Sequence, residues 1–314
     1  MTDYVKMAME ARKKVTRLTL EQQSDIMDMY EDVVESLSSK AGRAKNESLT
    51  KRWVTDYLKE VTAERRELQK KLNKAIKDSI NKAAQHGTSV QLEMFTKIQE
   101  VGGIDLGPHF TDMFSAVQKD VVGSIISGDL YKDARSLSDR IWTLGNDLKK
   151  DVQYIVNRGI LEKKSAIELA RDLERYVNDP AKRASTWGKA YPNLKNKQVD
   201  YNAQRLARTS INHAYQNATI KSSSMNPYVD GIEWRSALAH ERTCEVCQER
   251  HGQVFPVDDV PLDHPNGLCV NLPVITKSLD DVADELRDWI YGADNSMLDE
   301  WFQKHGEYFA FKRL

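Results

Sequence analysis

All three cysteines of the chain lie within 26 positions, at Cys244, Cys247 and Cys269. Two of the seven histidines, His251 and His264, lie in the same stretch. Zinc favours four thiolate or imidazole ligands in a tetrahedral arrangement, and a C-x-x-C pair places two thiolates on one turn. The spacing therefore predicts a structural zinc site formed by the three cysteines and His264. The segment is too short to fold on burial alone, so metal binding would supply the missing free energy.

Other interpretations of the same cysteines stay open. A buried cysteine often serves as a small apolar residue. A C-x-x-C pair can also be a redox couple, although no thioredoxin-like βαβ pattern surrounds this one. His251 is an alternative ligand to His264. The odd number of cysteines and the absence of an apolar signal-peptide core in the first residues favour a reducing compartment over a disulfide framework.

Signs of catalysis are weak. The stretch from His240 begins like the H-E-x-x-H zinc motif, but Cys244 replaces the second histidine. The G-x-S-x-G motif of serine hydrolases does not occur. The pair Asp263-His264 is similar to part of the motif of His-Asn-His nucleases, in which a histidine activates water beside a metal-bound phosphate. These enzymes need a further His or Asn downstream, and the one candidate, Asn271, lies too close to Cys269. We predict a protein that is not an enzyme, with a metal-dependent nuclease or DNA-processing factor as the alternative.

The formal net charge is −1, but the charges are unevenly distributed. Residues 40–82 carry thirteen Lys or Arg and six Asp or Glu, and residues 182–221 carry eight basic residues and one acid. Residues 278–300 carry eight acids and one base. Basic runs neutralise phosphates without reading bases, so we predict non-specific contact with double-stranded DNA, with ordinary solvated helix faces as the alternative. The candidate DNA-binding residues are Lys51, Arg52, Arg65, Arg66, Lys70, Lys71, Lys74, Lys77, Lys195, Lys197, Arg205 and Arg208.

Mainly helical elements are expected to position these residues. Apolar side chains recur at helical spacing over most of residues 1–225. Thr19 is expected to cap one helix and Gly42 to end it. Ser48 is expected to cap a long basic helix that ends near Gly87. We expect further helices over residues 113–125, 141–155, 166–173 (capped by Ser165) and 201–223.

The pattern changes after Asn226-Pro227. Residues 231–236 and 253–255 are predicted to be strands, and Ser278 to cap an acidic C-terminal helix. The predicted fold is mainly α, with long helices in the N-terminal two-thirds, a small C-terminal α+β unit resembling a zinc module, and a helical tail. No run of about 18 apolar residues occurs, so we expect no membrane anchor. The predicted domains are residues 1–105, 106–228, 229–275 and 276–314.

A series of motifs frames the cysteines. Trp234 lies in an expected strand, R-T-C-E-V-C follows at 242–247, H-G-Q-V-F at 251–255, and H-P-N-G-L-C at 264–269. These motifs resemble the C-terminal signature of the phage head-morphogenesis, or minor head protein, family of tailed phages, which includes the Mu-type F proteins. That signature has a Trp-containing strand, an R-T/V-C-x-x-C turn, H-G-x-x-F, and an H-P-x-C-R-C-x-x-x-P closure. Gly267 takes the place of one signature cysteine.

Upstream, Leu206-Ala207-Arg208-Thr209 is similar to the A-R-T-E helix of the family, with Ser210 in place of Glu, and the stretch from Arg158 to Ala170 is similar to its turn followed by a short helix. The resemblance therefore covers about residues 150–275. It implies a structural virion protein of the phage head interior, present in the host cytoplasm during assembly, that assists head assembly and genome packaging. The implied partners are the portal protein, major capsid or scaffold proteins, and double-stranded DNA, which some members accompany on ejection. A DNA-binding adaptor of mobile elements is a further alternative.

Overall fold

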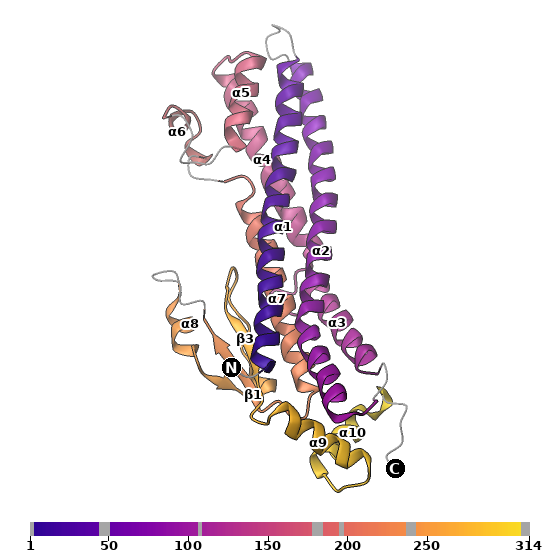
Figure 1. The fold of residues 1–314 in the computed structure, drawn as a ribbon. Helices are drawn as coiled ribbons and strands as arrows, with labels where there is room; N and C mark the ends of the chain where they lie inside the picture. Colours follow the sequence, from indigo (N-terminus) through magenta and orange to yellow (C-terminus); the bar gives the residue numbers. More distant parts are fainter. Residues whose placement is uncertain are drawn as a thin grey trace. The chain divides into compact units, whose positions relative to one another are not determined.

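The computed structural model describes residues 3–43, 51–105, 109–177, 185–194, 198–236 and 243–308. Within these residues the protein is mainly helical with one small sheet, which confirms the predicted fold class (Figure 1). The longer helices are α1 (Asp3–Gly42), α2 (Lys51–Gly102), α3 (His109–Ser127), α4 (Leu137–Leu161), α5 (Ala166–Val177) and α7 (Tyr201–Ser224).

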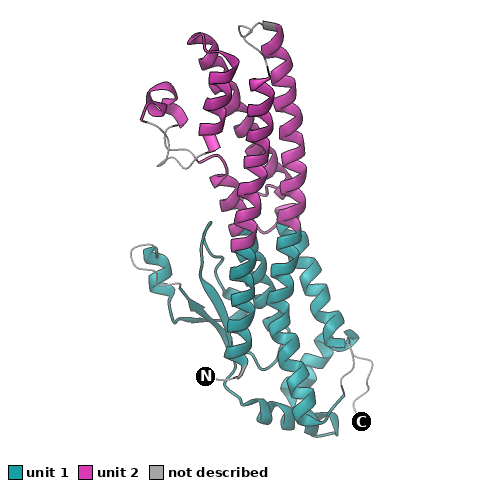
Figure 2. Cartoon of the chain, turned by 45° about the horizontal axis from the view of Figure 1, so that its top comes forward, with its two compact units in different colours: residues 1–19, 78–125, 209–314 teal, residues 20–77, 126–208 magenta. Residues whose placement is uncertain are grey.

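The chain forms two compact units, each assembled from separate segments (Figure 2). Unit 1 comprises Met1–Thr19, Asp78–Ile125 and Thr209–Leu314, and unit 2 comprises Leu20–Lys77 and Ile126–Arg208. The helices α1, α2 and α7 each contribute residues to both units. The two units are defined by their compactness, so they do not test the domain boundaries predicted from the sequence, which stay a prediction.

The first two helices differ from the sequence-based prediction. The cap predicted at Thr19 is wrong, because α1 is continuous there and the Thr19 hydroxyl donates a hydrogen bond to the Val15 carbonyl oxygen at 2.9 Å. The predicted end at Gly42 is confirmed, and Ser48 lies outside the described residues. The helix expected to end near Gly87 continues to Gly102.

Unit 2 contains two helices that begin at capping boxes. The Ser136 hydroxyl accepts from the backbone N–H of Asp139 at 3.1 Å, and the Asp139 carboxylate accepts from that of Ser136. The Ser165 hydroxyl accepts from the backbone N–H of Glu168, whose carboxylate accepts from that of Ser165 at 2.7 Å. Each pair satisfies donors that an isolated helix end would leave unpaired, and the cap predicted at Ser165 is confirmed.

A buried acid links α5 to the segment between α5 and α7, which contains α6 (Trp187–Ala190) and the short 3-10 helix η2 (Pro192–Leu194). The carboxylate of Asp172 on α5 accepts a hydrogen bond from the Tyr191 hydroxyl at 2.5 Å. It also pairs with the Lys164 ammonium group at 2.7 Å. This network fixes the segment after α6 against α5 within unit 2.

Unit 1 has an aromatic core where α2, α3 and α10 (Ser296–His305) meet. The rings of Phe95 and Phe110 stack with centroids 3.9 Å apart, and Trp301 stacks on Phe110 at 6.4 Å. The Trp301 indole N–H donates to the Met225 carbonyl oxygen at 2.8 Å. The helix α9 (Leu279–Ile290) precedes α10 and begins at Ser278, whose hydroxyl accepts from the backbone N–H of Asp281. The predicted Ser278 cap is thus confirmed.

The sheet of unit 1 has three antiparallel strands in the order β2-β1-β3, where β1 is Gly231–Arg235, β2 is Val254–Phe255 and β3 is Val270–Val274. Two strands lie where the sequence predicts them, and β3 was not predicted because Pro273 interrupts its pattern. Proline lacks a donor and is tolerated on an edge strand such as β3. The helix α8 (Glu245–Arg250) lies beside this sheet (Figure 1).

Candidate functional site

The three cysteines are held by the small sheet and α8 of unit 1. Cys244 is the N-cap residue of α8, Cys247 lies in that helix, and Cys269 directly precedes β3. Cys247 and Cys269 are buried against Trp234 of β1, whereas Cys244 is exposed. Packing of both cysteines against Trp234 therefore brings together thiols that are 22 residues apart in sequence.

Two groups of metal-ligand atoms converge at this point. The first contains Cys244, Cys247 and His264, and the second contains Cys247, Asp263 and Cys269. Within each group the donor atoms lie within 4.8 Å of one another. The structure thus brings together all four residues predicted from the sequence, and it adds Asp263, which the prediction did not include. Cys247 belongs to both groups.

The loop that carries Asp263 and Cys269 is held by a polar face of α7. The Asn212 side-chain amide donates to the Asp263 carboxylate at 3.0 Å, and the His213 imidazole hydrogen-bonds to the Asp263 carbonyl oxygen at 3.0 Å. The Gln216 amide donates to the Cys269 carbonyl oxygen at 2.8 Å. These contacts come from one helix face within unit 1, so α7 positions the loop.

The Asp263 carboxylate lies beside the glycine that replaces a signature cysteine. A Cβ atom at Gly267 would overlap all three terminal atoms of the Asp263 side chain. The carboxylate also accepts from the backbone N–H of His264 at 2.9 Å and that of Cys269 at 3.3 Å. The carboxylate therefore occupies the space in which a side chain at position 267 would begin.

Burial controls the protonation of the thiols. Burial raises the pKa of the Cys247 thiol, and the adjacent thiols of Cys244 and Cys269 raise it further. Burial also raises the pKa of Cys269, with a second contribution from the Asp263 carboxylate. The pKa of the exposed Cys244 is lowered, chiefly because the backbone N–H of Cys247 hydrogen-bonds to it. The two buried cysteines are thus thiols at neutral pH without a metal, and metal binding must release their protons.

The two histidines of the stretch differ in their hydrogen bonding. The His264 Nδ1 atom lies 3.1 Å from the Pro265 carbonyl oxygen, so Nδ1 donates and Nε2 keeps its lone pair. This hydrogen bond is also the main reason that the pKa of His264 is raised. The His251 Nδ1 atom accepts from the backbone N–H of Ser236 at 3.1 Å. The lone pair of His251 Nδ1 is thus engaged, and His251 belongs to neither donor group in the described part of the chain.

The donor set fits a zinc ion. Tetrahedral zinc with Zn–S bonds of ~2.3 Å places two sulfur ligands about 3.8 Å apart, so donor atoms within 4.8 Å of one another need to move by about 1 Å. Thiolate, imidazole and carboxylate groups are all zinc ligands. A bound ion would cross-link α8 to the loop before β3, which is a structural role.

The candidate DNA-binding residues of α2 divide by their environment. Arg52, Arg66, Lys70, Lys71 and Lys74 are exposed, and Arg65 and Lys77 are partly buried. Three of these seven already have partners: Arg65 donates to the Asn146 side chain, Lys70 pairs with Glu67 at 2.8 Å, and Lys71 pairs with Asp32 at 3.5 Å. Lys51 begins α2, and nothing further is described of its side chain.

The remaining candidates lie on or near α7. Arg205 is exposed and Arg208 is partly buried, and both belong to unit 2. Lys195 and Lys197 lie outside the described residues. The structure therefore shows no single surface that gathers all the predicted residues within its described part, but one gathering of basic groups, which includes Arg66, lies in unit 2.

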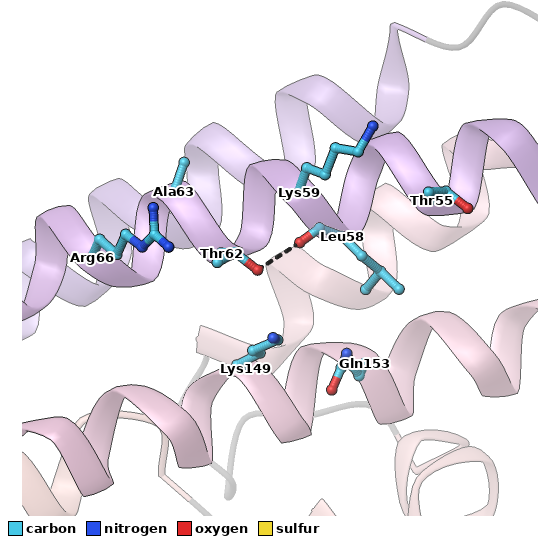
Figure 3. Close-up of a pocket in the computed structure, with 8 residues that line it drawn as sticks. All are labelled: Thr55, Leu58, Lys59, Thr62, Ala63, Arg66, Lys149 and Gln153. Carbon is cyan, nitrogen blue, oxygen red and sulfur yellow. Dashed lines mark hydrogen bonds between the residues drawn. The ribbon is translucent and has the colours of Figure 1, made fainter.

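That gathering is a groove between α2 and α4 of unit 2 (Figure 3). Lys59 and Arg66 of α2 line one side, and Lys149 and Gln153 of α4 line the other. No acidic side chain is among the described residues that line it, which besides those four are Thr55, Leu58, Thr62 and Ala63. An adjoining pocket on α4 adds Lys150 and the exposed Trp142, together with Asp147.

Sequence reasoning did not identify Lys149 as a candidate, because the prediction placed the basic surface on α2 and the segments near α7. The signal that identifies it is the pair Lys149-Lys150 on a helix whose apolar residues Leu148 and Val152 are buried. Helical periodicity then places Lys149 and Gln153, four positions apart, on one face. Which helix faces that side of α4 is decided by tertiary packing alone.

The comparison with protein families identifies the central region. Residues 115–269 match the family described as Phage Mu protein F like protein, over just under half of the chain. This region is Mu F-like. The match confirms the resemblance predicted from the motifs around the cysteines, and it ends at Cys269, the last of the candidate metal ligands. No curated protein and no solved structure matches the chain.

A Mu F-like family indicates a role in phage head morphogenesis. All residues of the candidate metal centre, from Cys244 to Cys269, lie inside the matched region. So does the α4 side of the basic groove. In the described part of the chain, no helix combines the length and the apolar composition that crossing a membrane requires.

Proposed function

We propose that this protein is a minor head protein of a tailed phage, which joins the portal and the capsid or scaffold proteins at the capsid interior and assists head assembly and genome packaging. The observation that carries the proposal is the Mu F-like match over residues 115–269. The small α+β unit that carries the candidate metal ligands supports it, because a bound metal would stiffen such a short segment without a large core. The protein would be made in the host cytoplasm and retained in the virion.

The test is the composition of purified phage heads. We expect the protein in heads at a few copies, and co-purifying with the portal protein of the same phage when the two are expressed together. Heads made without the protein should be fewer or should contain less DNA. The proposal would be refuted if wild-type heads lack the protein and if heads form normally when the protein is not made.

Contact with double-stranded DNA is the second part of the proposal, and the basic groove of unit 2 supports it. Arg66 and Lys149 line the groove from two different helices (Figure 3). Lysine and arginine side chains that line a groove can neutralise phosphates independently of the base sequence. The exposed ring of Trp142 beside Lys150 gives the neighbouring pocket a mixed cationic and aromatic surface.

The DNA contact is tested by the salt dependence of binding to random-sequence duplex DNA. We expect affinity to fall steeply between ~50 and ~200 mM salt. The double substitution Arg66→Glu with Lys149→Glu should weaken binding and lower the slope of log K against log salt by about 2, since two phosphate contacts are lost. Lys13→Glu is the matched control, because Lys13 is exposed and pairs with Glu10 in unit 1. Equal effects of the two changes would remove the groove as the contact surface.

A nuclease is the alternative, and one observation favours it: His264 is exposed beside a candidate metal centre and keeps a lone pair on Nε2. A plasmid-nicking assay with Mg²⁺ or Mn²⁺ tests it. We expect no nicking above that of a mock preparation. Nicking by the wild-type protein that disappears in His264→Ala would establish the enzyme instead.

A further inference from the structure

We propose that the Asp263 carboxylate is the fourth metal ligand, together with Cys244, Cys247 and Cys269, and that it replaces the side chain missing at Gly267. The proposal differs from the sequence-based set, in which His264 is the fourth ligand. It concerns the composition of the metal centre and does not depend on the role of the protein in head assembly.

The first argument is spatial. The signature of the resembling family has a cysteine where this chain has Gly267, and a Cβ at that position would overlap the Asp263 carboxylate. The carboxylate and a cysteine side chain at position 267 therefore exclude each other. One carboxylate oxygen lies within 4.8 Å of the sulfur atoms of Cys247 and Cys269. The space in which a side chain at position 267 would begin is thus filled by a group that brings an oxygen ligand near the same two thiols.

The second argument is the charge balance. Asp263 is 3% exposed, and the hydrogen bonds that its carboxylate accepts come from neutral groups: the Asn212 amide and the backbone N–H groups of His264 and Cys269. Buried charges are normally paired or bound to a metal, because burying an unpaired charge is costly. A divalent cation among Cys247, Cys269 and Asp263 supplies the missing positive charge.

The surroundings of Asp263 include the imidazoles of His213 and His264 and one permanently charged side chain, that of Arg12 on α1. Its guanidinium group donates to the Asn212 side-chain oxygen at 2.8 Å and to the Leu268 carbonyl oxygen at 3.1 Å, so its hydrogen bonds go to neighbours of the carboxylate. Three thiolates and one carboxylate around Zn²⁺ leave a net charge of −2. Arg12 is close enough to offset part of this charge. The positive charge of Arg12 therefore makes a ligand set with this net negative charge acceptable at this position.

The third argument is burial. Cys247, Asp263 and Cys269 are all buried, whereas Cys244 and His264 are exposed. Structural zinc sites are closed, with four protein ligands and no position open to water. The buried group supplies three ligands, and Cys244 completes the set because its sulfur is already within reach of Cys247. His264 is exposed and is then not a ligand, although its donor atom lies within 4.8 Å of the sulfur atoms of Cys244 and Cys247.

The experiment compares two isosteric changes, Asp263→Asn and His264→Gln, in the full chain. Asparagine keeps the shape and one of the two acceptor oxygens, so it can keep the hydrogen bond from the backbone N–H of His264 or that of Cys269 but not both, and circular dichroism checks the fold. We expect Asp263→Asn to weaken Zn²⁺ binding by more than about 100-fold, beyond the usual effect of an outer-shell change. His264→Gln should change affinity by less than about 10-fold. A loss in His264→Gln equal to or greater than that in Asp263→Asn overturns the proposal.

Cobalt substitution gives a reading that does not depend on affinity. With Co²⁺, the intensity of the sulfur-to-metal charge-transfer band follows the number of bound thiolates, and the visible bands report the fourth ligand. We expect His264→Gln to leave the wild-type spectrum unchanged. A changed spectrum in that variant would establish His264 as a ligand and refute the proposal.

The compensating double substitution, Asp263→Gly with Gly267→Cys, is the final test. It removes the carboxylate and places a sulfur in the vacated space. We expect Asp263→Gly alone to lose the metal and the double variant to regain it with a stronger charge-transfer band, because four sulfurs replace three. Failure of the second change to restore Co²⁺ binding would show that the carboxylate does not occupy a ligand position.

Discussion

Gly87 of α2 lies directly against the main chain of Tyr215 on α7. A Cβ atom at Gly87 would lie 2.6 Å from the Tyr215 carbonyl oxygen and 2.7 Å from the Cβ of Ala218. Both helices contribute these residues to unit 1. The absence of a side chain at position 87 therefore allows the two helices to pack closely, and the helix continues through the glycine because that packing outweighs its poor helix propensity.

Gly87→Ala should destabilise the protein by about 1–3 kcal/mol, because the added methyl group would force backbone to move. Gly123→Ala is the control in a second helix of unit 1, since a Cβ there meets nothing within 4 Å. That change should stabilise the protein by about 0.5–1 kcal/mol through helix propensity. Urea unfolding measures both free energies, and a stabilising effect of Gly87→Ala would contradict the packing described.

Asp172→Ala should destabilise unit 2 by roughly 3 kcal/mol, because it leaves the Lys164 ammonium and the Tyr191 hydroxyl without their shared acceptor. Chemical denaturation measures the loss. Asp56→Ala is the control: its carboxylate pairs with Lys59 on an exposed helix face, where solvent screening leaves an ion pair little effect on stability. Similar losses for the two substitutions would show that the buried network adds nothing beyond a surface pair.

Metal removal should lower the thermal stability of the protein. A zinc ion that binds only the folded chain stabilises it by about 4 kcal/mol when its concentration is 1,000-fold above Kd. We expect a chelator to lower the melting temperature of the wild-type protein and to leave that of Cys247→Ser unchanged, because Cys247 belongs to both donor groups. A wild-type protein that is unaffected by chelation, and that carries no zinc when purified, would exclude the structural role of the metal.

Mild acid should destabilise the metal-free protein, with a contribution from His86. Burial lowers the pKa of His86, and the nearby cations Lys14 and Lys82 lower it further. Between the folded and the higher unfolded pKa, the unfolded chain binds more protons, so stability decreases as the pH falls from about 7 through the unfolded value of ~6.5. His86→Gln should reduce this dependence when melting temperatures are compared in chelator. An identical pH profile for the two proteins would show that His86 does not contribute.

The elements that were predicted correctly from the sequence are those whose formation depends on residues close by in the chain. The caps at Ser165 and Ser278 depend on a hydroxyl and an acid three residues later, and both form. The strands at Trp234 and Val254 follow local alternation. The expectations at Thr19 and Gly87 were wrong because both positions lie in helices whose continuity is decided by packing against distant segments.

The metal centre shows the same division. The spacing of Cys244, Cys247, His264 and Cys269 was sufficient to predict that they come together, and the structure places each of them in a donor group. Asp263 was considered only as part of a nuclease-like pair. Its proximity to Gly267 and the sulfurs depends on how α7 holds the loop, through Asn212 at a separation of 51 residues. Such contacts are not encoded by local spacing.

The segments that form unit 1 have a consequence for synthesis on the ribosome. Unit 2 uses no residue beyond Arg208, so all of its parts exist once that point has been translated. In unit 1, the Arg12 guanidinium of α1 hydrogen-bonds to Asn212 and to Leu268, which lies 256 residues later. These hydrogen bonds can form only after both partners have been synthesised. Because chains emerge from the N-terminal side onward, residues of α1 that are made before the rest of unit 1 are among the last to find their native partners. Until then the apolar face of the first turns of α1 stays exposed to solvent, and a nascent chain stalled before the cysteine module would present that face to chaperones.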